Sequence, residues 1–354
     1  SFDASYTDQT LELLAFSEEI SNQPTITEFT KVDLTGGQEI EGAKMQILDQ
    51  EGKVVEEWVS KKEAHVVYAL APGEYILHEE QAPTEQGYVR AEDVKFVVEE
   101  TGDVQKVKME DDHTKVSISK TDITDGKEIE GAKLQILDQD GEVVESWTTG
   151  EEHLIEYLPV GTYTLHEEAA VDGYIVANDV EFTVEETGEI QKVKMEDERA
   201  MGQLVIVKTD TDSKAALEGV EFVLLEKETG KEVGRLKTGK DGKAVSELLP
   251  IGTYENGVFK EPITYVLKET ATLKGYEKTE EEWEIVFTYQ NDKTPVIEVV
   301  KEIQNKKIPE TPGTVKPGPK TGDDTNWFLP LLALGVSAGM VAGLLYYRKR
   351  HKKA

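Results

Sequence analysis

The strongest constraint on the fold is an internal repeat built from short strand-like segments. Residues 127–147 (KEIEGAKLQILDQDGEVVESW) nearly reproduce residues 38–58 (QEIEGAKMQILDQEGKVVEEW), and residues 180–197 nearly reproduce residues 94–111. A more divergent third copy follows, and the copies recur about every 88 residues, which is the size of one small domain. We therefore expect similar domains in tandem rather than the turns of a solenoid.

The pattern within each copy favours β-structure. Short runs of β-branched and aromatic residues alternate with turn signals such as Asp140-Gly141 and Asp241-Gly242. No segment before Trp327 has a helical period. Because regularly spaced short strands are typical of sandwiches, we predict an all-β chain of immunoglobulin-like or prealbumin-like β-sandwiches in a row.

The composition narrows the classes of function. The net charge is −32, with 71 acidic and 39 basic residues, so the chain would repel the phosphates of a nucleic acid. The absence of cysteine excludes disulfides, thiolate catalysis and cysteine metal sites. The six histidines do not cluster at metal-binding spacing. We expect no metal, no cofactor and no nucleic-acid partner.

Charged residues lie on strand faces that should be apolar. In the second copy, strand alternation places Lys120, Glu167 and Asp197 on the apolar faces of three separate segments. An unpaired buried charge is too costly to keep, so the three charges should be partners. Their chemistry points to a lysine–aspartate amide (isopeptide) bond, with the glutamate as the proton shuttle.

Two other interpretations of these charges stay open. The three residues would form a buried ion-pair network if no covalent bond joined them. Alternatively, the lysine would extend its amine from the strand end to solvent, although this would not explain the matching glutamate and aspartate.

The composition changes after Ile308. Residues 309–320 are rich in proline and glycine, which is typical of a semi-rigid, wall-spanning linker. Residues 327–347 form an apolar stretch of about 20 residues, which is long enough to cross a bilayer as one helix. The basic tail, residues 348–354, should stay on the cytoplasmic side, which leaves everything upstream outside the cell.

The C-terminal motif resembles the LPXTG-like sorting signal of Gram-positive surface proteins. Pro319, Lys320, Thr321 and Gly322 precede the apolar span and the basic tail. The resemblance implies that residues 321–354 are the sorting-signal region and that, after transient membrane insertion, a sortase cuts the bond between Thr321 and Gly322. It would join Thr321 to peptidoglycan or to another pilin subunit. Gly318 stands where the common pattern has leucine, so the class of sortase stays open.

The repeats resemble Cna B-type (SpaA-pilin-like) domains from Pro24 to Ile308. The resemblance rests on SKTD near the start of a copy, on YILHEEQAPTEQGY and YTLHEEAAVDGY in the middle, and on KVKMED at the end. It implies domains at 24–113, 114–199 and 200–308, each with one intramolecular isopeptide bond and one proton-shuttle glutamate. The matching residues are Lys31, Glu79 and Asp111; Lys120, Glu167 and Asp197; and Lys208, Glu269 and Asn305.

Residues 1–23 carry a weaker signal of the same kind. The sequence Ile20-Ser21-Asn22 mirrors Ile303-Gln304-Asn305, which closes the third copy. We therefore expect residues 1–23 to be the end of a truncated upstream domain.

Together these features predict a structural stalk anchored to the cell wall of a Gram-positive bacterium. It would project an upstream adhesive or functional domain, through which any host-surface ligand would bind. Its only chemistry would be single-turnover self-crosslinking, so we do not expect an enzyme. The alternatives are a basal or shaft pilin, an adhesin that binds host matrix directly, and the anchor region of a surface enzyme.

Overall fold

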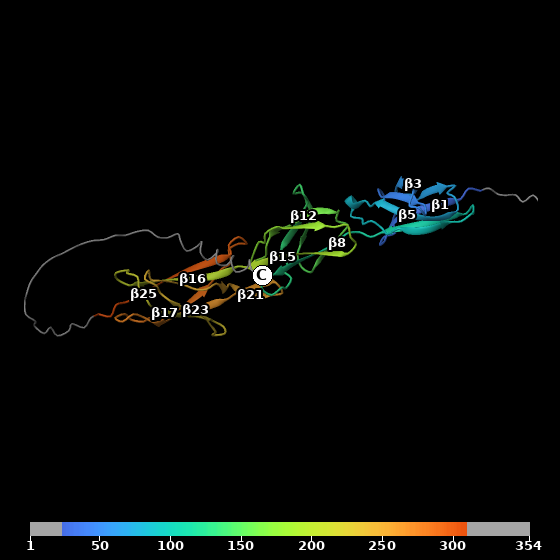
Figure 1. Ribbon diagram of the computed structural model, residues 1–354. Coiled ribbons are helices and arrows are strands. Elements are labelled where there is room, and N and C mark those ends of the chain that lie inside the picture. Colours follow the sequence, from blue (N-terminus) through green and yellow to red (C-terminus); the bar gives the residue numbers. More distant parts are fainter. Residues whose placement is uncertain (1–22, 310–354) are drawn as a thin grey trace, which may run out of the picture. The chain divides into compact units, whose positions relative to one another are not determined.

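The computed structural model describes residues 23–309 (Figure 1). This part of the chain contains 25 strands and one short 3-10 helix, Thr84–Gln86, and no α-helix. The strands form three β-sandwiches in chain order, each with two facing sheets. The prediction of an all-β chain of tandem sandwiches is therefore confirmed.

The first sandwich contains strands β1–β7. One sheet has the strand order β4-β1-β7, and the other has the order β3-β2-β5-β6. The strands are β1 (Ile26–Asp33), β2 (Lys44–Leu48), β3 (Val54–Val59), β4 (His65–Tyr68), β5 (Gly73–Gln81), β6 (Val94–Val98) and β7 (Val104–Asp111).

The second sandwich repeats this arrangement and adds one short strand. Its sheets have the orders β11-β8-β15-β13 and β10-β9-β12-β14. The strands are β8 (Lys115–Asp122), β9 (Lys133–Leu137), β10 (Val143–Thr148), β11 (His153–Glu156), β12 (Gly161–Ala169), β13 (Tyr174–Ile175), β14 (Val180–Val184) and β15 (Ile190–Arg199).

The third sandwich has the same plan and an additional hairpin, β21–β22. Strand β16 pairs with β19, β20 and β25 in one sheet, and the other sheet has the order β18-β17-β23-β24. The strands are β16 (Met201–Asp210), β17 (Glu221–Glu226), β18 (Glu232–Lys237), β19 (Lys243–Val245), β20 (Leu249–Pro250), β21 (Gly252–Glu255), β22 (Val258–Pro262), β23 (Thr264–Ala271), β24 (Glu282–Val286) and β25 (Val296–Asn305).

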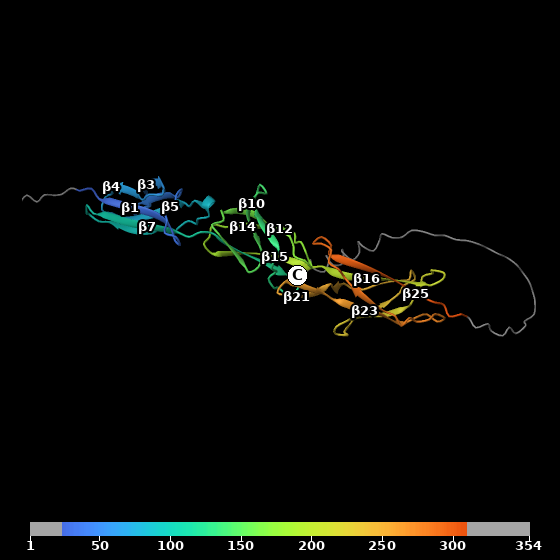
Figure 2. The ribbon, with the colours of Figure 1, turned by 180° about the vertical axis from the view of Figure 1, so that it is seen from behind.

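The first and last strands of each sandwich lie side by side and run parallel. Figure 2 shows this pairing for β1 and β7, and the same pairing joins β8 to β15 and β16 to β25. Because the two strands point the same way, the chain enters each sandwich at one end and leaves it at the other.

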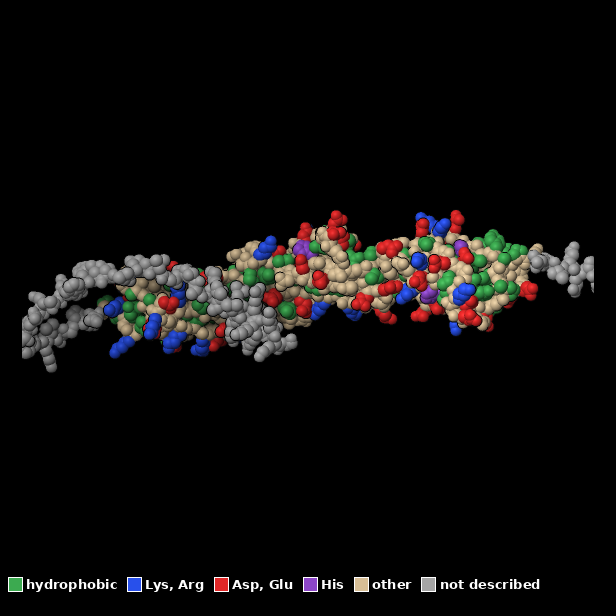
Figure 3. All heavy atoms as spheres, turned by 45° about the horizontal axis from the view of Figure 1, so that its top comes forward, with side chains coloured by type: hydrophobic (Ala, Val, Ile, Leu, Met, Phe, Trp, Pro, Cys, Tyr) green, Lys and Arg blue, Asp and Glu red, His purple; other side chains and the backbone are tan. Residues whose placement is uncertain are grey.

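Each core comes from the inward-facing residues of both sheets. In β8, Val116, Ile118 and Lys120 are buried on the face that alternation predicts, and Ser117 on the opposite face is buried as well. The turn signals also act as predicted, because Gly141 between β9 and β10 has φ +81°, a conformation that favours glycine. On the face shown in Figure 3, acidic side chains are scattered over the surface rather than gathered in one patch.

The predicted sorting motif, apolar span and basic tail lie outside the described residues. Residues 1–22, which we expect to be the end of an upstream domain, also lie outside them. Between residues 23 and 309, no helix has the length and apolar character that crossing a membrane requires.

Candidate functional site

The first sandwich brings together the three residues that the sequence predicted. Lys31, Glu79 and Asp111 come from β1, β5 and β7, and their exposed fractions are 3%, 1% and 0%. The Lys31 Nζ atom lies 2.9 Å from Glu79 Oε2 and directly contacts Asp111 Oδ1. A cation and two carboxyl groups therefore meet inside the core of a β-sandwich.

The second sandwich contains the same site. Lys120, Glu167 and Asp197 come from β8, β12 and β15, and all three are buried. Lys120 Nζ lies 2.9 Å from Glu167 Oε2 and contacts Asp197 Oδ1. The near-identical geometry follows from the near-identical sequence of the two copies.

The third sandwich assembles its site with an amide in place of one carboxyl group. Lys208 Nζ lies 3.0 Å from Glu269 Oε2 and contacts Asn305 Oδ1. Asn305 Nδ2 donates to Glu269 Oε1 at 2.7 Å and to Thr272 Oγ1 at 2.7 Å. Despite the divergent sequence, the three predicted residues are again buried and in contact.

The strand register explains why these residues meet. In the parallel pair β1–β7, Lys31 lies opposite Met109, so Asp111 is two residues further along on the same inward face. The pairs β8–β15 and β16–β25 place Asp197 and Asn305 at the same offset from their lysines. The glutamate comes from the facing sheet in each case, so the site links both layers of the sandwich.

Burial changes the protonation of the acids. Removal from water raises the pKa of Asp111 to about 7, and the neighbouring Glu79 adds to this rise against the opposing charge of Lys31. The pKa of Asp197 rises to about 7 for the same reasons. Burial also lowers the pKa of Lys208. These shifts favour a neutral acid in the first two sites and a neutral amine in the third.

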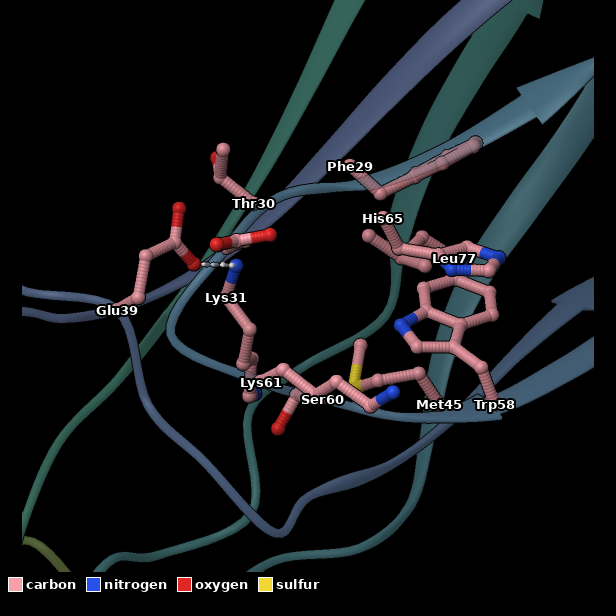
Figure 4. Close-up of a pocket in the computed structure, with 11 residues that line it drawn as sticks. Phe29, Thr30, Lys31, Glu39, Met45, Trp58, Ser60, Lys61, His65 and Leu77 are labelled. Carbon is pink, nitrogen blue, oxygen red and sulfur yellow. Dashed lines mark hydrogen bonds between the residues drawn. The ribbon is translucent and has the colours of Figure 1, made fainter.

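The pocket beside Lys31 has a mixed lining. Figure 4 shows Phe29, Met45, Trp58 and Leu77 on its apolar side, and polar side chains such as Glu39 and Ser60 complete it. Within the described residues, neither Asp111 Oδ2 nor Glu79 Oε1 has a hydrogen-bond partner. One oxygen of each acid is therefore free of protein donors, which is the arrangement that a leaving oxygen or a proton acceptor needs.

Two further groups of the sites were not predicted. The backbone N–H of Ala91 donates to Glu79 Oε2 at 2.7 Å, and that of Ala177 donates to Glu167 Oε2 at 2.6 Å. Backbone donors carry no side-chain signal, so the sequence could not identify them.

A repeated glutamate supports each of the first two lysines from outside the site. The backbone N–H of Lys31 donates to Glu39 Oε2 at 3.1 Å, which is the dashed contact in Figure 4. Glu128 accepts in the same way from Lys120 at 3.2 Å. These glutamates recur in the repeated segments 38–58 and 127–147, which was the signal that could have identified them.

The remaining site predictions concern metal binding and the sorting motif. No group of three or more acidic or histidine side chains between residues 23 and 309 is arranged to hold a metal ion. The predicted sorting residues, Pro319 to Gly322, lie outside the described part of the chain.

Comparison with known proteins identifies the domains. The SpaA family model, described as a prealbumin-like fold domain, matches residues 25–113, 114–199 and 202–262. The chain belongs to this family. The third match ends before β23, so Glu269 and Asn305 lie beyond it.

Comparison with solved structures finds similar chains. The Bacillus anthracis TIE protein is 28% identical over 80% of this chain and 51% of that chain, with a TM-score of 0.55. BcpA, the major pilin subunit of Bacillus cereus, is 15% identical over 80% of this chain and all of that chain, with a TM-score of 0.45. A streptococcal ancillary pilin is 16% identical, covering 81% and 100% of the two chains, with a TM-score of 0.33. The chain thus spans about half the length of the TIE chain, and a search of curated proteins finds no match.

Proposed function

We propose that this chain is the stalk of a Gram-positive surface protein, and that three intramolecular isopeptide bonds stabilise it. The main support for the proposal is that each of the three sandwiches buries a lysine in contact with an acyl group and a glutamate. Each lysine is on the first strand of its sandwich, and each acyl group is on the last. The bonds would be Lys31–Asp111, Lys120–Asp197 and Lys208–Asn305.

The reaction in the first two sandwiches is a condensation. The neutral Lys120 amine attacks Cγ of the protonated Asp197, and Glu167, 2.9 Å from the amine, accepts a proton from the nitrogen. The tetrahedral intermediate collapses when Glu167 returns a proton to the leaving hydroxyl group. The C–O bond breaks, an amide remains, and one water molecule leaves. Asp111 reacts with Lys31 in the same way.

The third sandwich releases ammonia instead. Asn305 Oδ1 faces the Lys208 amine, and its Nδ2 group already donates to Glu269. The amine attacks Cγ of Asn305, and Glu269 transfers the proton from the attacking nitrogen to the leaving –NH₂ group. The reaction forms one amide, breaks another and releases one ammonia molecule.

The position of the bonds supports a load-bearing role. Lys31 and Asp111 are 80 residues apart, and the other two pairs are 77 and 97 residues apart. By analogy with disulfides, closing loops of this size would stabilise each sandwich by roughly 4–5 kcal/mol. A pulling force that enters on the first strand would leave through the last strand without loading the core.

Peptide mapping tests the crosslinks. Residues 1–308 are digested with trypsin, and we expect three branched peptides that join the predicted pairs. Glu79→Ala, Glu167→Ala and Glu269→Ala should each remove the branched peptide of their own sandwich and leave the other two. If the wild-type digest contained only linear peptides, the three sites would be buried ion-pair networks without a covalent bond.

The stalk would be anchored through the C-terminal motif. The order of Pro319-Lys320-Thr321-Gly322, apolar span and basic tail supports sorting to the cell wall, where Thr321 would be joined to peptidoglycan. We expect Thr321→Ala to move the protein from the wall fraction to the membrane fraction, because sortase cleavage is lost. Equal wall anchoring of both forms would refute this part of the proposal.

A second candidate function is a pilus subunit, because three SpaA-type domains in series are also compatible with a pilin. In that case Thr321 would be joined to another subunit. Wall extracts would then contain a ladder of covalent multimers, whereas a single-chain stalk gives one anchored species.

A further inference from the structure

The shuttle glutamates of the first two sandwiches are oriented by a backbone segment. We call this the orienting segment; it comprises residues 87–91 in the first sandwich and residues 173–177 in the second. Ala91 ends the first segment and Ala177 ends the second, and their N–H groups donate to Glu79 and Glu167. Because a charged acceptor makes a strong hydrogen bond, this contact fixes where the carboxylate points.

The nature of the acyl donor explains why this contact is needed. A protonated aspartate has one O–H donor, but in the described part of the chain neither Asp111 Oδ2 nor Asp197 Oδ2 has a hydrogen-bond partner. Asn305, by contrast, donates from its Nδ2 group directly to Glu269 Oε1. Within residues 23–309, no backbone N–H donates to the Glu269 carboxylate. The third site therefore orients its own glutamate, whereas the first two depend on the orienting segment.

The third sandwich holds the orienting segment of the second. The Tyr289 hydroxyl donates a hydrogen bond to the carbonyl of Tyr174 at 2.9 Å. The Val176 N–H donates a hydrogen bond to the carbonyl of Asp292, also at 2.9 Å. Tyr254, on the additional hairpin, donates to the carbonyl of Gly173 at 2.8 Å. Three hydrogen bonds with the third sandwich thus hold three of the four residues that precede Ala177.

The contact at Gly173 is too close for any larger residue. A Cβ atom there would lie 2.7 Å from the Phe259 ring and 2.8 Å from the Tyr254 hydroxyl, and Gly173 has φ +89°. Strand β13, which lies in the orienting segment, pairs with the end of β15. The close approach indicates a docked interface at this junction.

The first junction has the same plan, with fewer hydrogen bonds to the orienting segment. The Arg90 N–H, which precedes Ala91, donates to Glu186 Oε1 of the second sandwich at 3.2 Å. A Cβ atom at Gly87 would lie 2.3 Å from the carbonyl oxygen of Tyr157, and the Tyr88 and Tyr157 rings meet edge to face at 5.6 Å. In both junctions, the residue before the orienting alanine donates its N–H group to the sandwich that follows.

We propose that the second and third sandwiches position the shuttle glutamates of the first and second, respectively, with Tyr289 as a positioning residue for the Lys120–Asp197 bond. The inference rests on the proposed isopeptide function. Docking of the third sandwich holds residues 173–177, and Ala177 then orients Glu167. Crosslinking of the second sandwich therefore reaches its full rate only after the third sandwich has folded and docked.

The test follows the three bonds separately in the full 354-residue chain. The chain is made by cell-free translation, samples are quenched in acid at intervals, and the three branched peptides are quantified by mass spectrometry. We expect Tyr289→Phe to slow the Lys120–Asp197 bond about fivefold, because one hydrogen bond is lost. Tyr254→Phe combined with Tyr289→Phe should slow it further. The other two bonds should form at the wild-type rate.

Tyr265→Phe is the matched control. The Tyr265 hydroxyl donates to the Pro250 carbonyl within the third sandwich, so its loss should leave the Lys120–Asp197 rate unchanged. Amide hydrogen exchange gives a second readout, taken in a Lys120→Met background that cannot form the bond. Tyr289→Phe should accelerate exchange at Ala177 and leave Leu165, in β12, unchanged.

The possible outcomes separate the two proposals. If the wild-type chain forms no branched peptides, the isopeptide function itself is wrong. If the wild type forms them and both the single and the double variant match its rate, the positioning role is refuted. Equal slowing of the Lys120–Asp197 and Lys208–Asn305 bonds would also refute it, because the substitution would then act by destabilising the third sandwich.

Discussion

The substitution Glu167→Gln separates the crosslink from the packing of the second sandwich. Glutamine keeps the size of the side chain and its contact with the Ala177 N–H, but it does not accept the proton that amide formation releases. We expect the variant to fold with Lys120 and Asp197 in contact and without the covalent bond between them.

The size of the effect follows from the loop that the bond closes. Lys120 and Asp197 are 77 residues apart, and the loop-entropy relation used for disulfides gives roughly 4–5 kcal/mol for a loop of this length. For a domain of this size, each kcal/mol shifts the melting temperature by roughly 4–8 °C. The second sandwich of Glu167→Gln should therefore melt roughly 20–35 °C below that of the wild type.

Differential scanning calorimetry of residues 1–308 measures this shift. Glu168→Gln is the matched control, because Glu168 is the next residue along β12 and is exposed. It should leave the calorimetric profile unchanged. A branched peptide in Glu167→Gln would show that Glu167 is not the proton shuttle. Loss of the bond with a melting temperature within a few degrees of the wild type would show that loop closure does not stabilise the sandwich.

Two further predictions concern the other sandwiches. The substitution Glu79→Gln should leave Asp111 without its crosslink. Burial is the main cause of the raised pKa of Asp111, so its pKa in the folded state stays above the unfolded value. The folded state therefore binds the proton more tightly than the unfolded state. Urea unfolding should show the first sandwich losing roughly 1–3 kcal/mol as the pH rises from 4 to 8, and a flat profile would contradict this. Asn305→Asp should replace the loss of ammonia by the loss of water and slow the third bond, because the substituted carboxyl group would lack the N–H donor to Glu269. Time-resolved intact mass would detect both changes, and a rate equal to the wild type would contradict the role of the amide.

Much of the fold and the core of each site could be predicted from the sequence. Strand alternation placed Lys120, Glu167 and Asp197 on inward faces, and the structure buries all three. The third site was also predicted, although its sequence diverges, because Lys208, Glu269 and Asn305 keep their places on the corresponding strands.

The orienting contacts could not be predicted, for physical reasons. Ala91 and Ala177 act through backbone N–H groups, which every residue but proline has, so their side chains reveal nothing. The role of Tyr289 depends on how two sandwiches dock, and this is set by contacts more than 100 residues apart. The additional hairpin was visible only as an insertion, residues 255–263, and its contact with Gly173 required the structure.

Self-crosslinking at all three sites changes the intact mass of denatured wild-type residues 1–308. We expect a mass below that of the sequence by two water molecules and one ammonia molecule. A mass equal to that of the unmodified sequence would contradict this expectation, because none of the three amide bonds would then have formed.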